Sequence, residues 1–444
     1  MSRDLLRLRR GHAPNCSSGS SVVGAALVSA TVAAALINAW AHRFLHELPP
    51  SDPDDHGPKR PRLRREHFGA ILAWAGVQLH ISPAWADHAR ARGIEEVGAD
   101  AQPVEGALSA PTEVHLAVTE RCPAPCRGCY LGATPDGAHA DLDALRGALD
   151  ALAALGTFEV ALGGGEALLR PELLSIVQHA HDRGLTPNLT VSGIGLTPAR
   201  ARALAPLVGQ VNISIDGLGA VYVAARGWDG AARGLEAVRT LSAAGVRVGV
   251  NTVLSRPLLE TPGALRALGA AIRAAGAAEW QWLRFKPTGR GTDTWAALAP
   301  SSGQLAALWE EALDLEDHTD LTIRYDCALT PFIAAAGVPA ARMDRMGVSG
   351  CVGGESLLSR DARGGWAPCS FVPATAPGPS AAAAWRADAA VLAWRARAAS
   401  PPEPCASCEH QATCRGGCRA VSAHLTGDPM APDPQCPRVQ SWTG

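Results

Sequence analysis

The 444-residue sequence has no excess of charge of either sign, because 40 lysine and arginine residues stand against 42 aspartate and glutamate residues. This balance gives no long-range attraction to nucleic acid or to an anionic membrane surface, so we expect no nucleic-acid partner. Cysteine is also scarce, since 12 residues are far below the density of a small disulfide scaffold. Hydrophobic residues make up 47% of the chain, which excludes a disordered polypeptide and allows two or three domains.

The sequence also lacks a strongly hydrophobic run of membrane-spanning length. Residues Val22 to Ala41 are long enough to cross a bilayer and follow a basic start. They are mostly Ala, Ser, Thr and Gly, however, with Asn38 among them, so their hydrophobicity is marginal. We favour an alanine-rich helix over a membrane anchor or a signal peptide. A precursor-like segment fused to its own enzyme, "GHAPNCSSGSS" with Cys16, is a further alternative.

Changes in composition divide the chain into five segments. A polar, proline-rich linker, "LPPSDPDDHGPKRPRLRRE", marks the first boundary. The segment after it predicts two short strands and a helix, which are too few to fold alone. The five segments are a head with its linker at 1–66, a small β/α extension at 67–111, a repeating core at 112–295, a bridging region at 296–350 and a cysteine-rich region at 351–440.

Within residues 112–295, apolar strands alternate with amphipathic helices such as 141–155, whose leucines recur on one stripe. Gly156, Gly184 and Gly245 stand where helices should stop. This α/β pattern predicts a parallel sheet, either open and doubly wound or closed into a partial barrel. In both folds the chemistry lies at the C-terminal ends of the strands. The expected strands are 114–119, 158–163, 187–192, 210–215, 246–252 and 280–285.

Three cysteines, Cys122, Cys126 and Cys129, follow the first expected strand in the loop "TERCPAPCRGCYLGA". Incidental buried thiols do not usually cluster in a loop rich in proline and glycine. A zinc site would need a fourth ligand, for which His139 is available. We favour a cluster of four irons on three thiolates, because the iron without a cysteine is then open to a substrate or cofactor.

The spacing Cx3Cx2C and its place after the first strand resemble the radical S-adenosylmethionine (SAM) superfamily. The resemblance implies a partial (β/α)6 TIM-like barrel, a catalytic 4Fe-4S cluster on these three cysteines, and SAM as the cofactor. Gly128 departs from the family, which often has an aromatic residue at that position, and Tyr130 comes two places late.

Other stretches resemble the family's cofactor-binding segments. In "ALGGGEALLRPEL", Gly164, Gly165 and Glu166 resemble the GGE motif, which holds the amino group of the methionine of SAM. "VNISIDGLGAVYVAARG" resembles the SxDG…RG stretch of the peptide-modifying members. The resemblance and the strand ends together give the remaining candidate contacts to SAM or substrate: Ser192, Ser214, Asp216, Asn251, Lys286 and Arg290.

The C-terminal cysteines resemble the seven-cysteine SPASM domain at every spacing. Taken alone, the run from 405 to 418 also fits a zinc ribbon. SPASM domains hold two auxiliary 4Fe-4S clusters. The resemblance implies an outer cluster on Cys405, Cys408, Cys414 and Cys436, and an inner cluster on Cys351, Cys369 and Cys418, with Cys327 as the expected fourth ligand.

This resemblance implies a cytoplasmic enzyme that cleaves SAM to a 5′-deoxyadenosyl radical and oxidatively modifies or cross-links a ribosomally made peptide. Export would separate its clusters from cytosolic SAM and from a reductant of the flavodoxin or ferredoxin type. Two alternatives stay open. One is a sulfatase-type maturase that forms formylglycine, and the other is a non-catalytic electron carrier with several clusters.

Overall fold

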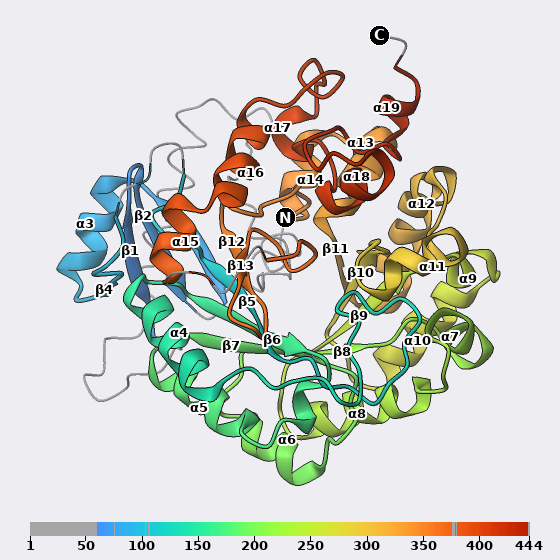
Figure 1. Ribbon diagram of the computed structural model, residues 1–444, viewed down its shortest axis with the longest axis horizontal. Helices are drawn as coiled ribbons and strands as arrows, with labels where there is room; N and C mark the ends of the chain where they lie inside the picture. Colours follow the sequence, from blue (N-terminus) through green and yellow to red (C-terminus); the bar gives the residue numbers. More distant parts are fainter. Residues whose placement is uncertain are drawn as a thin grey trace.

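A curved, mostly parallel sheet forms the centre of the molecule (Figure 1). The structure is a computed structural model that describes residues 60–74, 76–102, 104, 107–374, 378 and 380–442. Among these residues the sheet has nine strands in the order β11-β10-β9-β8-β7-β6-β5-β12-β13. Neighbouring strands pair in parallel from β11 to β12, whereas β12 and β13 are antiparallel. The strands are β5 Glu113–Thr119, β6 Glu159–Gly164, β7 Thr186–Val191, β8 Val211–Ser214, β9 Val248–Leu254, β10 Glu279–Arg284, β11 Thr322–Tyr325, β12 Leu357–Arg360 and β13 Trp366–Ala367.

Helices cover the outer face of this sheet and return the chain from one parallel strand to the next (Figure 1). This arrangement is a partial barrel. The predicted α/β class with a partial (β/α)6 TIM-like barrel is therefore confirmed, and the open doubly wound alternative is wrong. The helices of this region are α4 Leu142–Ala154, the 3-10 helix η2 Ala167–Leu169, α5 Leu173–Asp182, α6 Pro198–Leu204, α7 Gly219–Arg226, α8 Ala231–Ala243, α9 Arg256–Glu260, α10 Ala264–Ala274, α11 Arg290–Leu298 and α12 Ser302–Thr319.

Helix α4 shows how the local sequence produces these elements. Asp141 precedes the helix, and its carboxylate accepts a backbone N–H of the first turn at 2.8 Å. Leu145, Leu149 and Leu152 lie on one stripe and are completely buried. Gly156 follows with a φ of 71°, a left-handed conformation that ends the helix at little cost only for glycine. The leucines therefore determine which face of α4 is buried, and Gly156 determines where the helix ends.

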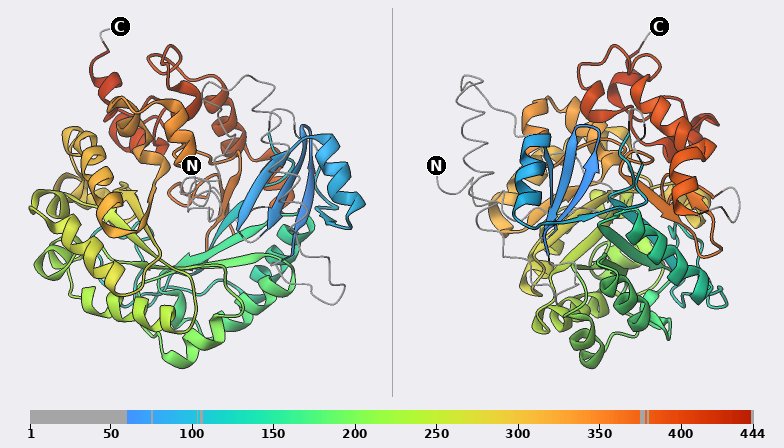
Figure 2. Two further views of the ribbon diagram at one scale, coloured as in Figure 1. Left: turned by 180° about the vertical axis from the view of Figure 1, so that it is seen from behind. Right: turned by 90° about the vertical axis from the view of Figure 1, so that its left-hand side faces the viewer.

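A second, smaller sheet lies against one edge of the barrel (Figure 2). Its described strands follow the order β3-β2-β1-β4. The sequence predicts two strands and a helix here, and its composition favours a polar linker up to residue 66. The elements are β1 Arg62–Glu66, β2 Gly69–Trp74, β3 Val77–Ile81, α3 Pro83–Ala91 and β4 Glu95–Val97, so the last part of the predicted linker is a strand.

The linker prediction failed at β1 because its arginines are buried rather than solvated. Arg64 is 0% exposed, and its Nε donates to Glu66 Oε1 at 2.8 Å. The two Nη atoms donate to the carbonyls of Pro111, Gly156 and Ala110 at 2.9–3.0 Å. A buried guanidinium is tolerated when its N–H groups have such partners. Arg64 therefore ties the small sheet to the barrel.

The chain beyond residue 295 contributes strands that the sequence analysis did not predict. Strand β11 extends the barrel on one side, and β12 pairs with β5 on the other, with Leu357 opposite Glu113. These strands are only two to four residues long, too short for a periodic pattern. The remaining helices are η3 Cys327–Leu329, α13 Thr330–Ala335, α14 Ala340–Arg345, α15 Ala381–Ala387, α16 Ala389–Ala399, α17 Gln411–Cys414, α18 Arg419–Thr426 and α19 Pro437–Gln440.

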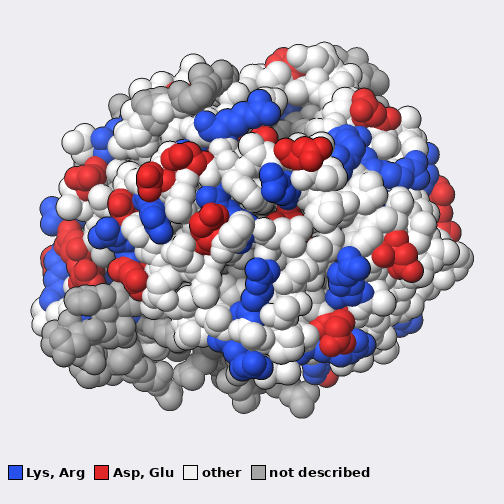
Figure 3. All heavy atoms as spheres, turned by 60° about the horizontal axis from the view of Figure 1, so that its bottom comes forward, with Lys and Arg blue, Asp and Glu red and all other residues white. Residues whose placement is uncertain are grey.

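The distribution of charge and the length of the apolar helices are relevant to possible partners. Acidic and basic side chains are interspersed on the face displayed in Figure 3. No helix in the part of the chain that the structure describes is both long and apolar enough to span a bilayer. The stretch Val22 to Ala41 and the segment around Cys16 lie outside the described residues.

Candidate active site

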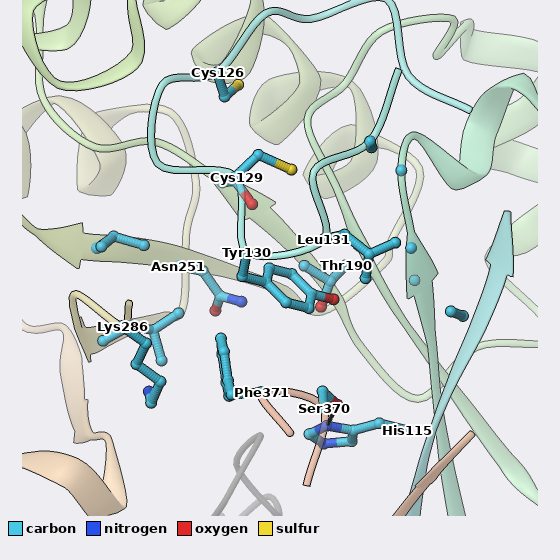
Figure 4. Close-up of a pocket in the computed structure, with 18 of the residues that line it drawn as sticks. His115, Cys126, Cys129, Tyr130, Leu131, Thr190, Asn251, Lys286, Ser370 and Phe371 are labelled. Atoms are coloured by element: carbon cyan, nitrogen blue, oxygen red, sulfur yellow. Dashed lines mark hydrogen bonds between the residues drawn. The ribbon is translucent and has the colours of Figure 1, made fainter. Parts of the chain in front are cut away.

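A cavity of about 300 Å³ lies at the C-terminal ends of the barrel strands. The cysteine loop borders it, and Cys122, Cys126 and Cys129 all line it. Residues from the cysteine-rich region, between 359 and 374, line it as well. Figure 4 shows Cys126 and Cys129 at one end and His115 at the other, so the cavity joins the two predicted cluster regions.

The cysteine loop is held by backbone bonds and by one arginine. Cys122 N donates to the carbonyl of Thr134 at 2.8 Å. Arg290, at the start of α11, donates from Nε to the carbonyl of Cys126 at 2.8 Å, and its backbone N donates to that of Cys129 at 3.0 Å. The sequence placed Arg290 at the rim as a possible ligand contact, whereas the structure uses it as a clamp on the loop.

Burial raises the pKa of the Cys122 thiol to about 11, and the negative charges of Glu166, Cys126 and Cys129 add to the rise. The Cys122 thiol therefore stays protonated until a cation stabilises its thiolate, as metal binding does. Three soft sulfur ligands around one cavity are the donor set that an iron–sulfur cluster requires. The residues present therefore fit such a cluster.

The zinc alternative depended on His139. Its Nδ1 lies 2.9 Å from Thr119 Oγ1, and the ring does not line the cavity. In the described ranges, no three His, Cys, Asp or Glu side chains are grouped closely enough to hold a single metal ion. His139 therefore acts as a hydrogen-bonding partner of β5 in this structure.

The glycine run at the end of β6 packs directly against the cysteine loop. A Cβ on Gly164 would lie 2.2 Å from the carbonyl oxygen of Thr119, and one on Gly165 would lie 2.2 Å from that of Arg121. Only glycine fits such close approaches of two backbones. At Gly163 the nearest atom would be 3.8 Å away, so the space at this residue belongs to the cavity.

Glu166 lies behind this wall and not in the cavity. It is 0% exposed, and its Oε2 accepts hydrogen bonds from the backbone N of Ser192 at 2.8 Å and from the Ser192 hydroxyl. Its Oε1 accepts the backbone N–H of Leu168 at 3.1 Å. Burial raises the pKa of Glu166, while these hydrogen bonds lower it. Ser192 lines the cavity, so Glu166 fixes the position of a residue in the cavity wall.

Two other predicted contacts, Ser214 and Asn251, line the cavity; Ser214 is the last residue of β8, and Asn251 lies in the middle of β9. Asn251 is 4% exposed, and its Oδ1 has no hydrogen-bond partner among the described residues. A buried oxygen without a partner is costly unless a ligand donates to it. The carboxylate of Asp216 is already engaged, since it accepts from Arg226 Nε at 2.6 Å and from Val253 N at 2.8 Å.

Phe285 is an aromatic residue that the sequence analysis missed. It lines the cavity just after β10, and its Cε2 lies 2.6 Å from where a Cβ on Gly128 would be. The loop position at which relatives often have an aromatic residue is thus covered by a ring from another strand. In the sequence, a glycine at position 128 in place of an aromatic residue was the signal that another part of the chain supplies the ring.

The far end of the cavity carries polar side chains, of which the sequence indicated Lys286 but not His115 or Ser370. His115 lies with Nδ1 2.8 Å from Ser370 Oγ and Nε2 3.2 Å from Glu113 Oε1. Lys286 is ion-paired with Asp326, and its Nζ lies 4.3 Å from the centre of the Phe371 ring. Figure 4 shows His115, Ser370, Lys286 and Phe371 across the cavity from Cys126.

The four cysteines predicted for the outer cluster lie near one another. Burial and then the charge of Cys436 raise the pKa of Cys414. Burial raises the pKa of Cys405, with a contribution from the charge of Cys436. The charge of Cys408 likewise contributes to the raised pKa of Cys436, where burial is the main cause. Electrostatic influence of this kind requires proximity.

The inner set also lies on adjoining segments. Cys327, which is 7% exposed, packs against Val352, the neighbour of Cys351. Ala328 packs with Cys418 and Phe371, and Phe371 comes two residues after Cys369. Asp433 joins this region to the barrel, because it accepts the backbone N of Cys418 at 3.0 Å and pairs with Arg284 of β10.

Comparison with known proteins gives the family. Residues 116–258 match the model of the radical SAM superfamily. A protein named PqqA peptide cyclase from Ruegeria pomeroyi is 31% identical over 75% of this chain and 89% of its own length. The mycofactocin maturase MftC of Mycobacterium tuberculosis is 28% identical over 75% of this chain and 84% of its own.

The crystal structure of Streptococcus suis SuiB bound to precursor peptide SuiA has the same fold. The TM-score is 0.68 at 14% identity, and the alignment covers 84% of this chain and 98% of SuiB. The family is defined by a 4Fe-4S cluster that binds SAM. With its cysteine loop on a partial barrel and a relative of 31% identity along most of its length, the chain belongs to the radical SAM superfamily.

Proposed function

We propose that this enzyme is a peptide maturase that oxidatively modifies or cross-links a ribosomally made precursor. The observation that carries the proposal is a single cavity with the cysteine loop on one side and residues next to Cys369 on the other. When bound, the cluster and SAM supply a 5′-deoxyadenosyl radical that removes a hydrogen atom from an unactivated C–H bond. Relatives named peptide cyclase and maturase support a peptide as the substrate.

We propose that the chain's own residues bind and orient SAM. Gly163 leaves room for the cofactor, and Ser192, fixed by Glu166, offers a hydroxyl at the cavity wall. The unpartnered Oδ1 of Asn251 accepts a hydrogen bond from the ligand. Phe285 presents an apolar ring that keeps water away from the cysteine loop. Together these groups hold the reactive part of the cofactor near the three thiolates.

We further propose two auxiliary 4Fe-4S clusters in the cysteine-rich region. Adjoining positions support Cys405, Cys408, Cys414 and Cys436 as the outer ligands. The contacts of Cys327 and Ala328 support Cys351, Cys369, Cys418 and Cys327 as the inner ligands. Because Ser370 follows Cys369 and lines the cavity, an electron acceptor at the inner site would lie close to the substrate. That position suits a net oxidation, with a flavodoxin- or ferredoxin-type protein as the reductant.

At the far end of the cavity, His115 and Ser370 offer the peptide a hydrogen-bonding site. The ammonium of Lys286 is neutralised by Asp326, so this end carries little net charge. A carrier that only transfers electrons has no use for a cavity of about 300 Å³ that is bordered by both the cysteine loop and the cysteine-rich region. The formylglycine alternative requires a Cys or Ser target. Oxidation of Ser to formylglycine also removes two hydrogen atoms, so the assay below identifies this product by the reaction of its aldehyde with a hydrazine, which a cross-link does not undergo.

The test uses the full chain, reconstituted anaerobically with iron and sulfide, together with SAM, dithionite and candidate peptides encoded beside its gene. We expect 5′-deoxyadenosine to form together with a peptide that has lost two hydrogen atoms per new bond. Conversion of Cys or Ser to formylglycine would support the sulfatase-type alternative. An absence of 5′-deoxyadenosine with every peptide would contradict the enzymatic proposal. Cys126→Ala is the matched control and should abolish 5′-deoxyadenosine formation.

A further inference from the structure

Two side-chain N–H groups point at the sulfur of Cys126. Trp228 Nε1 lies 3.1 Å from Cys126 Sγ, and Arg226 Nη1 lies 3.7 Å from it. Both donors come from the five-residue stretch "RGWDG", which begins at Arg226, the last residue of helix α7. Among the described residues, no side-chain N–H reaches the sulfur of Cys122 or Cys129. The three cysteines of the loop are therefore not equivalent.

Asp216 holds the guanidinium of Arg226 in this position. Asp216 Oδ2 accepts from Arg226 Nε at 2.6 Å, and the side chains are only 9% and 14% exposed. The other oxygen, Oδ1, accepts the backbone N–H of Val253 in β9 at 2.8 Å. The carboxylate is thus fixed from two sides, and it turns the guanidinium toward the cysteine loop. The SxDG…RG stretch, whose Ser214 and Asp216 were predicted to contact SAM or substrate, faces Cys126 through its arginine.

The glycines of the stretch let Trp228 come close. Gly227 has a φ of 82°, and a Cβ there would lie 2.8 Å from Arg127 Cγ of the cysteine loop. A Cβ on Gly230 would lie 2.4 Å from the Trp228 ring. The backbone N of Arg127 donates to the carbonyl of Arg226 at 3.0 Å. The stretch and the cysteine loop are therefore packed as one unit, which fixes the distance from the indole to the sulfur.

We propose that Arg226 and Trp228 are positioning residues for the radical SAM cluster, which their N–H groups contact through the sulfur of Cys126. The proposal rests on the family's cluster at this loop and not on the identity of the peptide. Hydrogen bonds to a ligand sulfur stabilise the more negative, reduced cluster and raise its reduction potential. Arg226 contributes a positive charge in addition. Asp216 acts through Arg226.

Trp228→Phe tests the proposal, because it removes the N–H and keeps an aromatic ring. The full, reconstituted chain is titrated with reductant, and the reduced cluster is followed by the EPR signal that changes when SAM is added. We expect a lower reduction potential than in the wild type, with unchanged iron content. Trp309→Phe is the matched control, since this indole lies on α12 and contacts Tyr325 instead. It should leave the potential unchanged.

Arg226→Gln provides a second, independent arm. The amide removes the positive charge and the guanidinium N–H from Cys126, so the potential should again fall. An unshifted potential in Trp228→Phe with full iron content would overturn the proposal. Loss of iron in Trp228→Phe, combined with an unshifted potential in Arg226→Gln, would overturn it as well. The readout contains no peptide, so a negative result leaves the maturase assay to be judged separately.

Discussion

Glu166 is a carboxylate whose two oxygens are both occupied by the protein. Glu166→Gln keeps the shape but places an amide against Ser192, whose N–H and hydroxyl both donate to the present oxygen. The loss of a charge-assisted hydrogen bond costs roughly 1.5–3 kcal/mol. Since roughly 1.4 kcal/mol is a factor of ten, we expect SAM affinity to fall about tenfold or more. The measurement is a SAM titration of the EPR signal of the reduced cluster.

Iron content should be unchanged in this variant, because Glu166 contacts no cysteine that we assign to iron. Glu172→Gln, a partly exposed change six residues away, is the control and should bind SAM normally. Wild-type affinity in Glu166→Gln would mean that the GGE segment serves only as a turn against the cysteine loop.

At the scale of residues, local spacing predicted the cysteines and the GGE segment because each lies within one loop. His115 and Ser370 are separated by 255 positions, and only pairing between β5 and β12 brings them together. Phe285 at Gly128 and Trp228 at Cys126 are likewise tertiary contacts. The sequence has no local pattern for such pairs, so it could not indicate them.

At the scale of elements, the first residues of β5 and β6 place two acids side by side. Glu113 and Glu159 are direct partners in the parallel pairing and are 2% and 4% exposed. Burial, followed by the charge of Glu113, raises the pKa of Glu159 to about 8. An acid whose pKa is raised by folding stabilises the protein fully below its ordinary pKa and loses that contribution as pH rises toward 8.

Glu159→Gln mimics the protonated acid and can still accept from Asn188, which now donates to the carboxylate at 2.9 Å. We expect the variant to melt at a higher temperature than the wild type, by a margin that widens from pH 6 to pH 8.5. The difference in unfolding free energy between the variant and the wild type grows by at most about 1.4 kcal/mol for each pH unit. Thermal unfolding at pH 6 and at pH 8.5 measures the two melting temperatures. Glu236→Gln, exposed on α8, should show no such trend, and a margin that narrows with pH would refute the assignment.

Asp433 links the cysteine-rich region to β10. It pairs with Arg284 where both side chains are 0–1% exposed, and it also accepts the backbone N of Cys418. Asp433→Asn leaves the buried guanidinium without its counter-charge, which costs about 3 kcal/mol or more. We expect a melting temperature several degrees lower, measured by calorimetry on the full chain. Asp428→Asn, in an exposed turn, is the control, and equal melting of the two variants would speak against the link.

The elements that the sequence predicted are those with long apolar or periodic patterns. All six expected strands of the core are present, within a few residues of their predicted ends. Strand β1 was missed because its arginines suggested a solvated linker, whereas Arg64 is buried with carbonyl partners. Strands β11 and β12 were missed because four residues are too few for a pattern, and their partners supply the stability.

At the scale of the whole molecule, three separate cysteine groups predict three clusters. We expect the reconstituted protein to bind about twelve iron and twelve sulfide per chain, as three 4Fe-4S clusters require. Cys408→Ala should lose about a third of the iron and retain some 5′-deoxyadenosine formation, but make no modified peptide. Iron and sulfide analysis with product chromatography measures both. About four irons in the wild type, or stoichiometric zinc, would rule out this count.

The pairing of β12 with β5 also determines an order of events during synthesis. The ribosome makes β5 first, but its partner on one side, Leu357–Arg360, emerges only after residues 120–356 have been added. At a translation rate of about 5–20 residues per second, this takes on the order of ten seconds or more. During that interval the edge of β5 has no neighbour there, and unpaired strand edges promote aggregation. The order of the strands therefore leaves this edge of β5 open to aggregation until β12 has been made.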